Sequence, residues 1–446
     1  MAHPHPKTLL VFSQTFVPDP AAVGQHMADV AFELGRRGNR VVVYTSRRGY
    51  EDPGLRYPAR EWREGVEIRR LAFSSFGKKN LLTRALGTFT FLVQCAVIAL
   101  FTPRLGGIFF STSPPLIGAA AALARIVRRV PIAYWAMDLN PDQLIAMGKV
   151  GPRSFTARVL ERVNRSILKR SSLIVALDRF MADRLRARGV PESRLAILPP
   201  WPHEDAMAPP AGPADNPFRV RHGLVGKFVI MYSGNHSPAN PLRTLLDAAV
   251  RFKDDDGLRF LFVGGGLGKR EVEATVRQHD LTNVVSLPYQ PLEALGDSLG
   301  AADVHVVSLG DNMVGIIHPC KIYGAMAVGR PVLFLGPRPS HVADLLDEHA
   351  IGWQVSHGDV AGTARAIEAM RAAPPDALAD MGRAARRALH ARMGQAILCG
   401  RLCDHLERVF RPHDAAEQPA QVGGDAATAA KVPAGPADER NVSCAR

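Results

Sequence analysis

Residues 315–332 read Gly-Ile-Ile-His-Pro-Cys-Lys-Ile-Tyr-Gly-Ala-Met-Ala-Val-Gly-Arg-Pro-Val. This pattern predicts a loop, a helix that begins near Pro319, a glycine turn and a buried strand over 331–335. A proline that opens a helix leaves first-turn N–H groups free beside the positive end of the helix dipole. Lys321 adds a positive charge there, which does not favour the helix itself. We therefore expect a phosphate at this helix, with an ordinary surface lysine as the alternative interpretation.

The same alternation of short apolar strands and helices extends outward from this stretch through most of the chain. In the first half we expect strands at 9–12, 40–45, 107–111, 132–135, 173–176 and 195–198, separated by helices. In the second half we expect strands at 228–232, 259–263, 284–287, 304–307, 332–335 and 352–355. Such alternation is typical of doubly wound parallel sheets. The fold class is therefore α/β, with two Rossmann-like halves that face a central cleft.

The boundaries between the two halves follow from composition. A chain of 446 residues is too long for one ordinary domain. We expect a first domain over 1–200, a Pro- and Ala-rich linker over 201–217 and a second domain over 218–412. The Ala-, Pro- and Gly-rich segment 413–446 predicts disorder.

Positive charge is concentrated in the first half. Residues 1–200 carry 30 Lys and Arg against 14 Asp and Glu, whereas the remaining residues carry 25 against 28. Such asymmetry indicates an anionic surface as a partner of the first domain. Few aromatic residues lie among the basic ones and no nucleic-acid motif is present, so we expect lipid rather than nucleic acid. Five cysteines without a CxxC pair, and no export signal, favour a cytoplasmic protein.

Two segments bear on the lipid hypothesis. Residues 85–103 carry no acidic or basic side chain and approach the length of a membrane span, but the next segment predicts an ordinary strand. A buried helix, a helix that dips into a membrane and a true span remain as alternatives, in that order. In 155–170, four basic residues share one stripe of a predicted helix and four apolar residues share another. The helix either packs its apolar stripe on the core and leaves its basic stripe in solvent, or presents the basic stripe to anionic lipid.

Glycine-rich turns after strands predict where a ligand approaches the backbone. Gly264, Gly265, Gly266 and Gly268 follow one strand of the second half, and Gly234 with Asn235 follows another. Neither half has GxGxxG after its first strand with an acidic residue about 20 positions on, and neither has GxxxxGK[ST]. A nicotinamide dehydrogenase and a P-loop NTPase are therefore not supported.

Several of these stretches together resemble a known family. The segments are 23–41 in the first half, Trp135-Ala136-Met137-Asp138-Leu139-Asn140-Pro141-Asp142, and the run from Pro319-Cys320-Lys321 to Val332. In order and spacing they are similar to family-four glycosyltransferases of the GT-B architecture. The subgroup is the one associated with O-antigen, colanic acid and other exopolysaccharides, including fucosamine transferases. The resemblance covers most of 8–410.

The resemblance implies a nucleotide-sugar donor in the second half, a lipid-linked or glycan acceptor in the first, and retention at the anomeric carbon. It implies no metal and no cofactor, so that fixed cations and helix N-termini stabilise the diphosphate leaving group. Diphosphate contacts are expected from Lys321, Gly234, Asn235 and Arg243. Contacts to the nucleotide or sugar are expected from Gly265, Gly266, Tyr289, His318, Pro319 and Tyr323. The acceptor side is expected at Gly24, Gln25 and His26.

The chain also departs from the family's pattern. Two glutamates that many members carry are replaced by Ile316 and Gly324. An arginine that clamps phosphate is replaced by Asn235, a lysine six positions later by Pro241, and a histidine before the aspartate by Met137. Lys321 is then the main cation expected at the diphosphate.

Asp138 is the acidic candidate at the cleft. It is expected either to orient the acceptor hydroxyl and stabilise positive charge on the donor ring, or to cap the helix that follows. His318 is expected to be a loop contact rather than a general base.

Three functions remain open at this point. The first is a retaining glycosyltransferase at the cytoplasmic face of the inner membrane. The others are a sugar-nucleotide epimerase on the same fold and a sugar-nucleotide-binding protein without catalytic activity.

Overall fold

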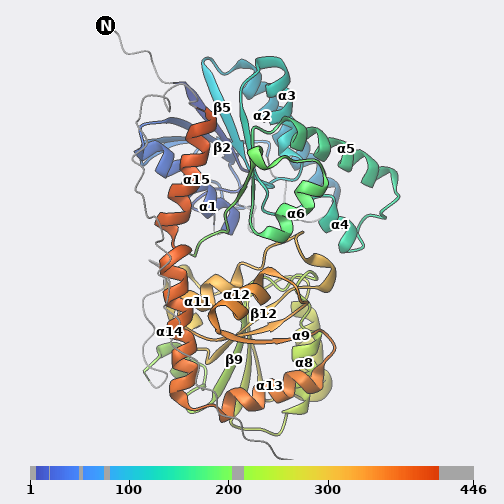
Figure 1. Cartoon of the computed structure of the whole chain (residues 1–446), viewed down its shortest axis with the longest axis vertical. Coiled ribbons are helices and arrows are strands. Elements are labelled where there is room, and N and C mark those ends of the chain that lie inside the picture. The colour runs from blue at the N-terminus through green and yellow to red at the C-terminus, as the bar shows by residue number, and fades with distance from the viewer. Residues whose placement is uncertain (1–6, 20, 50–53, 75–80, 203–214, 411–446) are drawn as a thin grey trace, which may run out of the picture.

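The structure is a computed structural model that describes residues 7–19, 21–49, 54–74, 81–202 and 215–410. Its two α/β units lie one above the other, each built around its own sheet (Figure 1). The fold expected from the sequence is confirmed.

The first sheet has eight strands in the order β3-β4-β2-β1-β5-β6-β7-β8. All neighbouring strands are parallel except β3 and β4. The strands are β1 (Thr8–Phe12), β2 (Arg40–Ser46), β3 (Arg60–Arg63), β4 (Val66–Leu71), β5 (Leu105–Phe110), β6 (Ile132–Trp135), β7 (Leu173–Ala176) and β8 (Leu195–Ile197). The central strands are wholly buried, as the short apolar runs predict.

Six helices accompany this sheet: α1 (Ala22–Arg36), α2 (Leu81–Phe101), α3 (Ile117–Arg128), α4 (Asp142–Ala146), α5 (Phe155–Arg170) and α6 (Arg179–Ala187). Two of them begin at capping side chains. The hydroxyl of Ser154 accepts a hydrogen bond from the Ala157 N–H at α5, and the Asp178 carboxylate accepts one from the Met181 N–H at α6. A 3-10 turn, η1 (Glu192–Arg194), precedes β8.

The second sheet has six parallel strands in the order β11-β10-β9-β12-β13-β14. They are β9 (Phe228–Ser233), β10 (Leu258–Val263), β11 (Val284–Leu287), β12 (Val304–Ser308), β13 (Val332–Leu335) and β14 (Gly352–Val355). Its helices are α7 (Pro217–Arg221), α8 (Arg243–Arg251), α9 (Lys269–His279), α10 (Leu295–Gly300), α11 (Lys321–Ala327), α12 (His341–His349) and α13 (Val360–Ala372), with 3-10 turns η3 (Leu292–Ala294) and η4 (Asp311–Met313).

The last two helices of the described chain join the two units. In Figure 1, α14 (Pro375–Arg392) and α15 (Gln395–Phe410) follow one another along one side of the molecule. Helix α14 packs on α11 and α12, whereas α15 packs on α1 and β7 of the first unit. The expected domain of 218–412 assigned α15 to the second unit, and the structure places it on the first.

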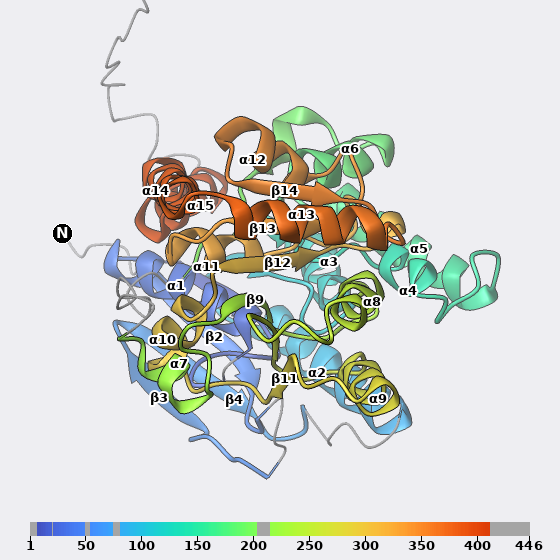
Figure 2. The ribbon, with the colours of Figure 1, turned by 90° about the horizontal axis from the view of Figure 1, so that it is seen from below.

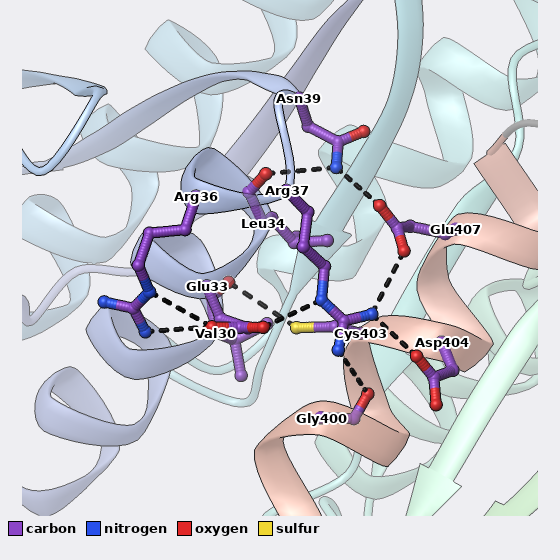
Figure 3. Close-up of polar contacts among 10 residues, drawn as sticks. All are labelled: Val30, Glu33, Leu34, Arg36, Arg37, Asn39, Gly400, Cys403, Asp404 and Glu407. Carbon is purple, nitrogen blue, oxygen red and sulfur yellow. Dashed lines mark hydrogen bonds and ion pairs between the residues drawn. The ribbon is translucent and has the colours of Figure 1, made fainter. Parts of the chain in front are cut away.

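Helix α15 is held there by apolar packing and by polar contacts. The Arg37 side chain donates hydrogen bonds to Glu33, Asp404 and Glu407, and Glu407 also accepts one from Asn39 (Figure 3). The ring of Phe410 covers Gly107, where a Cβ would lie 2.3 Å from a ring carbon. Helix α15, the last helix described, thus covers the apolar face of α1.

Helix α2 is buried on one face only. Phe91, Cys95 and Ala99 are fully buried, whereas the opposite face exposes Phe89 and Phe101 by 62% and 79%. Among the described residues no helix combines the length and hydropathy that a bilayer crossing needs. The expectation of a buried helix is therefore wrong for one face of α2.

Candidate functional site

A pocket of about 270 Å³ lies between the two units, at the carboxyl ends of the strands of the second sheet. This is the place where open α/β sheets bind ligands. The second unit supplies most of its wall, and the first unit supplies His26, Trp201 and Pro202. Figure 2 looks along the molecule from the side of the second unit, where α11 and β9 lie near the centre. Five predicted residues line the pocket: His26, Gly234, Tyr289, Lys321 and Tyr323.

Lys321 is the cation of this pocket. Its Nζ lies 5.1 Å from the centre of the Tyr232 ring, and a Cβ at Gly234 would lie 2.7 Å from its Cε. Burial lowers its pKa to about 8, because the surrounding protein replaces the water that stabilises an ammonium group. In the described part of the chain it forms no ion pair with an acidic side chain. The pocket therefore presents one positive charge that no carboxylate neutralises.

Two glycine turns interlock beside Lys321. Gly264 has a φ of +129°, and a Cβ there would lie 2.1 Å from the carbonyl oxygen of Gly234. A Cβ at Gly266 would lie 2.3 Å from Oδ1 of Asn235. The Lys269 ammonium donates to the carbonyl oxygens of Gly264, at 2.8 Å, and Leu287, at 2.6 Å. These contacts explain the glycines by close packing of one turn on the other.

The ring of Tyr289 lies over Gly265 and is 57% exposed at the pocket. Asn235, Gly265 and Gly266 adjoin the pocket without being among the residues that line it. Arg243 lies further away, on α8, where it is exposed and paired with Asp247 at 2.9 Å. The structure does not bring Arg243 to the pocket.

Asp138 follows β6 and lies against the loop that precedes α11. It forms an isolated antiparallel bridge with Ile317, and the Leu139 N–H donates to the Ile316 carbonyl at 2.9 Å. Burial raises the pKa of Asp138 to about 6, although a hydrogen bond from Gln143 acts in the opposite direction. Asp138 does not cap α4, since that helix begins after Pro141 without a side-chain cap. The capping interpretation of Asp138 is therefore wrong.

His318 and the buried Pro319 lie behind the pocket, in the loop before α11. The Nδ1 of His318 lies 2.7 Å from the Asp178 carboxylate, and its Nε2 lies 2.8 Å from the Tyr323 hydroxyl. That hydroxyl also lies 2.9 Å from Nε2 of His341. Both ring nitrogens of His318 thus have partners within the protein. Neither His318 nor Pro319, both expected to contact the nucleotide or sugar, is among the residues that line the pocket.

On the first unit, Gly24, Gln25 and His26 lie in the first turns of α1, and of these three residues His26 alone lines the pocket. A Cβ at Gly24 would lie 2.9 Å from the Phe16 nitrogen, so this glycine permits close packing. The His26 ring nitrogens lie 2.7 and 2.8 Å from the carbonyl oxygens of Ala22 and Trp201. His26 therefore fixes the start of the linker at the pocket wall.

Other lining residues had no signal in the sequence. Trp201 is buried, donates from its indole to Asp29 and stacks on Trp135. Ser298 lines the pocket, and its buried hydroxyl has no hydrogen-bond partner in the described structure. Trp201 lies in the segment expected to be a simple linker, and Ser298 lies on a short helix that carries no motif.

The replaced family positions also have a place in the structure. Ile316 is buried, and Gly324 lines the pocket, where a Cβ would lie 3.6 Å from the Leu299 side chain. Gly324 therefore leaves space where a side chain would enter the pocket. Within the described residues, no three His, Cys, Asp or Glu side chains are grouped so that they could hold a metal ion.

Comparison with known families agrees with this geometry. Residues 21–201 match the model of the glycosyl transferase 4-like domain, and residues 227–372 match that of glycosyl transferases group 1. The two matches coincide with the two units of the fold and meet at the pocket. The chain therefore belongs to the two-domain glycosyltransferases of the GT-B architecture.

Individual relatives are similar over most of their length. A Pseudomonas aeruginosa protein named as a glycosyltransferase, WbjE, is 24% identical over 68% of this chain and 76% of its own. An Escherichia coli K12 protein named as a colanic acid biosynthesis glycosyl transferase, WcaI, is 25% identical over 72% and 81%. Among solved structures, Anabaena HepE in complex with UDP and glucose has a TM-score of 0.66 and 16% identity, over 90% and 99%.

Proposed function

We propose that this protein transfers a sugar, with retention, from a nucleotide-sugar donor to a lipid-linked glycan acceptor in the assembly of a cell-surface polysaccharide. The observation that carries the proposal is Lys321, an uncompensated cation in the pocket between two glycosyltransferase units. The solved relative HepE, whose structure holds UDP and glucose, supports a nucleotide-sugar ligand. The names of WbjE and WcaI support the polysaccharide assignment.

In this proposal the bond between the anomeric carbon and the diphosphate breaks while an acceptor hydroxyl forms a new bond on the same face. The leaving nucleoside diphosphate gains negative charge, which Lys321 stabilises without a metal ion. The acceptor proton passes to a leaving phosphate oxygen. Asp138, on the first unit, orients the acceptor or stabilises the positive charge that develops on the sugar ring.

Substitution of Lys321 tests the site. Because a fixed charge at the leaving group acts in the transition state, Lys321→Ala is expected to lower kcat by about 10²–10³-fold. Lys253, an exposed lysine outside the pocket, supplies the matched control Lys253→Ala. Sugar transfer is measured after the donor has been found by thermal unfolding with a panel of sugar nucleotides, since a ligand of the folded state raises the unfolding temperature.

Undiminished transfer by Lys321→Ala would show that Lys321 does not belong to the active site. Conversion of a sugar nucleotide without any acceptor would instead indicate an epimerase. Donor binding without turnover, across a broad set of acceptors, would indicate a binding protein.

The proposal includes peripheral attachment to an anionic membrane, and the surface of α2 and α3 supports it. From the start of α2 to the residue after α3, 81–129, the sequence contains five Arg and no Asp or Glu. Helices α2 and α3 pack together. They expose a set of large apolar side chains: Leu86, Phe89, Val93, Val97, Phe101, Leu123, Ile126 and Val127. A surface that combines apolar side chains with cations is suited to the interface of a negatively charged bilayer.

Helix α5 adds to this surface from beside α3. Its Phe155 and Val159 are 75% and 39% exposed, while Ile167 is buried. The apolar stripe of α5 thus covers the core at one end and reaches solvent at the other, beside its basic residues.

Liposome sedimentation tests the membrane surface. We expect the protein to bind vesicles that contain 30% phosphatidylglycerol and to be released by salt, because screening weakens the attraction of exposed cations. The variant Phe89→Asn/Phe101→Asn is expected to bind more weakly, because apolar burial is lost. Leu267→Asn, at a residue 63% exposed on the second unit, is the control. Equal binding by both variants, or binding that salt does not reduce, would contradict the proposal.

A further inference from the structure

A chain of four polar side chains crosses the boundary between the two units behind the pocket. Asp178, at the beginning of α6, belongs to the first unit, and His318, Tyr323 and His341 belong to the second. Consecutive members lie 2.7, 2.8 and 2.9 Å apart. Asp178, His318 and Tyr323 are all buried, and the His318 and Tyr323 rings stack with 13° between their planes.

Which atoms of these four side chains carry the hydrogens follows from the residues at the two ends of the series. Asp178 accepts a hydrogen bond from the Met181 N–H at one oxygen and faces His318 with the other. The hydrogen bond from His318 lowers the pKa of Asp178 against the effect of burial, so its carboxylate is ionised and can only accept. Nδ1 of His318 must then carry a hydrogen.

Where His318 carries its hydrogen on Nδ1 alone, the remaining hydrogens have one possible arrangement. Nε2 of His318 accepts from the Tyr323 hydroxyl, and that oxygen accepts from Nε2–H of His341. Burial lowers the pKa of His341 to about 3, in agreement with a neutral ring at the far end. Every bond in the chain then points toward Asp178.

We propose that Asp178 is a positioning residue for the nucleotide pocket. Tyr323 lines the pocket and lies on α11, which begins with Lys321. The Asp178 carboxylate fixes the tautomer of His318, His318 fixes the Tyr323 hydroxyl, and the beginning of α11 is thereby held in place. Because Asp178 comes from the other unit, this arrangement exists only when the two units are in contact.

Neighbouring contacts hold the same loop from the same side. The Arg184 side chain donates to the Val314 carbonyl at 2.8 Å, and the Leu139 N–H donates to the Ile316 carbonyl. The first unit therefore forms hydrogen bonds both to the loop before α11 and to His318 within it. A change in the contact between the units is therefore expected to change the geometry of the pocket, and the reverse.

The first test reads the tautomer directly and does not depend on the proposed enzymatic activity. Long-range ¹⁵N–¹H NMR of histidine-labelled protein at pH 7.5, with the His318 signals assigned by His318→Gln, is expected to show a hydrogen on Nδ1 and none on Nε2. In Asp178→Asn, the amide oxygen still accepts from the Met181 N–H and the amide NH₂ faces Nδ1 of His318. His318 is therefore expected to change to the Nε2–H tautomer. Asn remains a good helix cap, so α6 is preserved. A wild-type His318 with Nε2–H, or protonated on both nitrogens, would overturn the assignment.

The second test measures the coupling to the pocket and rests on the proposed nucleotide site. UDP is the probe, and calorimetry gives its Kd. Asp178→Asn and Tyr323→Phe are each expected to raise Kd about tenfold, and the double variant no further than the larger single effect, because both break one chain. Arg179→Ala removes an exposed ion pair to Asp344 across the same boundary and is expected to change Kd less than twofold.

Additive effects of Asp178→Asn and Tyr323→Phe, or an equal loss in Arg179→Ala, would show that the boundary acts as a whole and that Asp178 has no special role. A wild type that binds no UDP would contradict the choice of nucleotide, and the tautomer measurement would still decide on Asp178.

Discussion

Lys321 combines a positive charge with a poorly hydrated position. Its pKa of about 8 in the folded protein lies below the value of about 10.4 for a hydrated lysine. Raising the pH through 8 therefore removes the charge from the folded pocket while an unfolded chain still keeps it. For this group, stability without ligand rises with pH between these two values, because the unfolded state then binds more protons.

The same titration predicts the pH dependence of ligand binding. An anionic diphosphate needs the charged form of Lys321, so we expect UDP affinity to fall as the pH rises from 7 to 9. In Lys321→Arg the charge persists at these pH values, and the decline attributable to this group should disappear. Calorimetry of both proteins at several pH values measures this difference. Parallel declines in the two proteins would assign the pH dependence to another group.

The residues of the site were predictable to different degrees. Lys321 and Gly234 had a local signal, since a cation at a helix start and a glycine after a strand each conflict with ordinary stability. Trp201 and Ser298 had none, because their role depends on which segments the two units bring together. Arg243 shows the converse: it was expected to compensate for the replaced phosphate-binding residues, but its partner is Asp247, one turn along the same helix.

At the level of elements, strands with continuous apolar runs were predictable, and β6 and β7 match their expected bounds. The antiparallel pair β3 and β4 was not predicted, because many charged residues in 60–71 hide the apolar side chains of its strands. Helix α15 has a clear apolar face, with Leu402 and Leu406 fully buried. Its sequence does not specify which unit covers that face, so its position on α1 required the structure.

The apolar and the polar contacts of α15 are expected to contribute differently to the free energy of unfolding. Leu406→Ala is expected to cost about 2–5 kcal/mol of unfolding free energy, since it removes a fully buried side chain. Arg37→Ala breaks ion pairs to Asp404 and Glu407 that remain partly exposed, and about 1 kcal/mol or less is expected for each such pair. Urea unfolding with the midpoint and slope compared between variants measures both. A larger loss in Arg37→Ala would show that the polar contacts dominate.

At the level of the whole molecule, the two units are in direct contact where the loop before α11 lies against α6. Gly315 lies in this loop with a φ of +70°, and a Cβ there would lie 2.6 Å from the carbonyl oxygen of Phe180. The close approach of the units therefore depends on the absence of a side chain at Gly315.

Gly315→Ala is expected to separate the units at this boundary while each sheet stays intact. Small-angle X-ray scattering should show a larger radius of gyration, with secondary structure unchanged by circular dichroism. Gly358→Ala is the control, because Gly358 has a φ of +84° and a Cβ there would meet no atom within 4 Å. It imposes a similar backbone strain without a clash. An unchanged radius in Gly315→Ala would mean that the loop adapts locally.

The return of α15 to the first unit also has a consequence for biosynthesis. Residues up to 202 leave the ribosome first, but the face of α1 that α15 covers stays open until the chain has been made to Phe410. At about 5–20 residues per second, the roughly 200 intervening residues take about 10–40 s. During that interval the nascent chain exposes an apolar surface to chaperones and neighbouring chains, and completion of its earliest domain coincides with the end of the second.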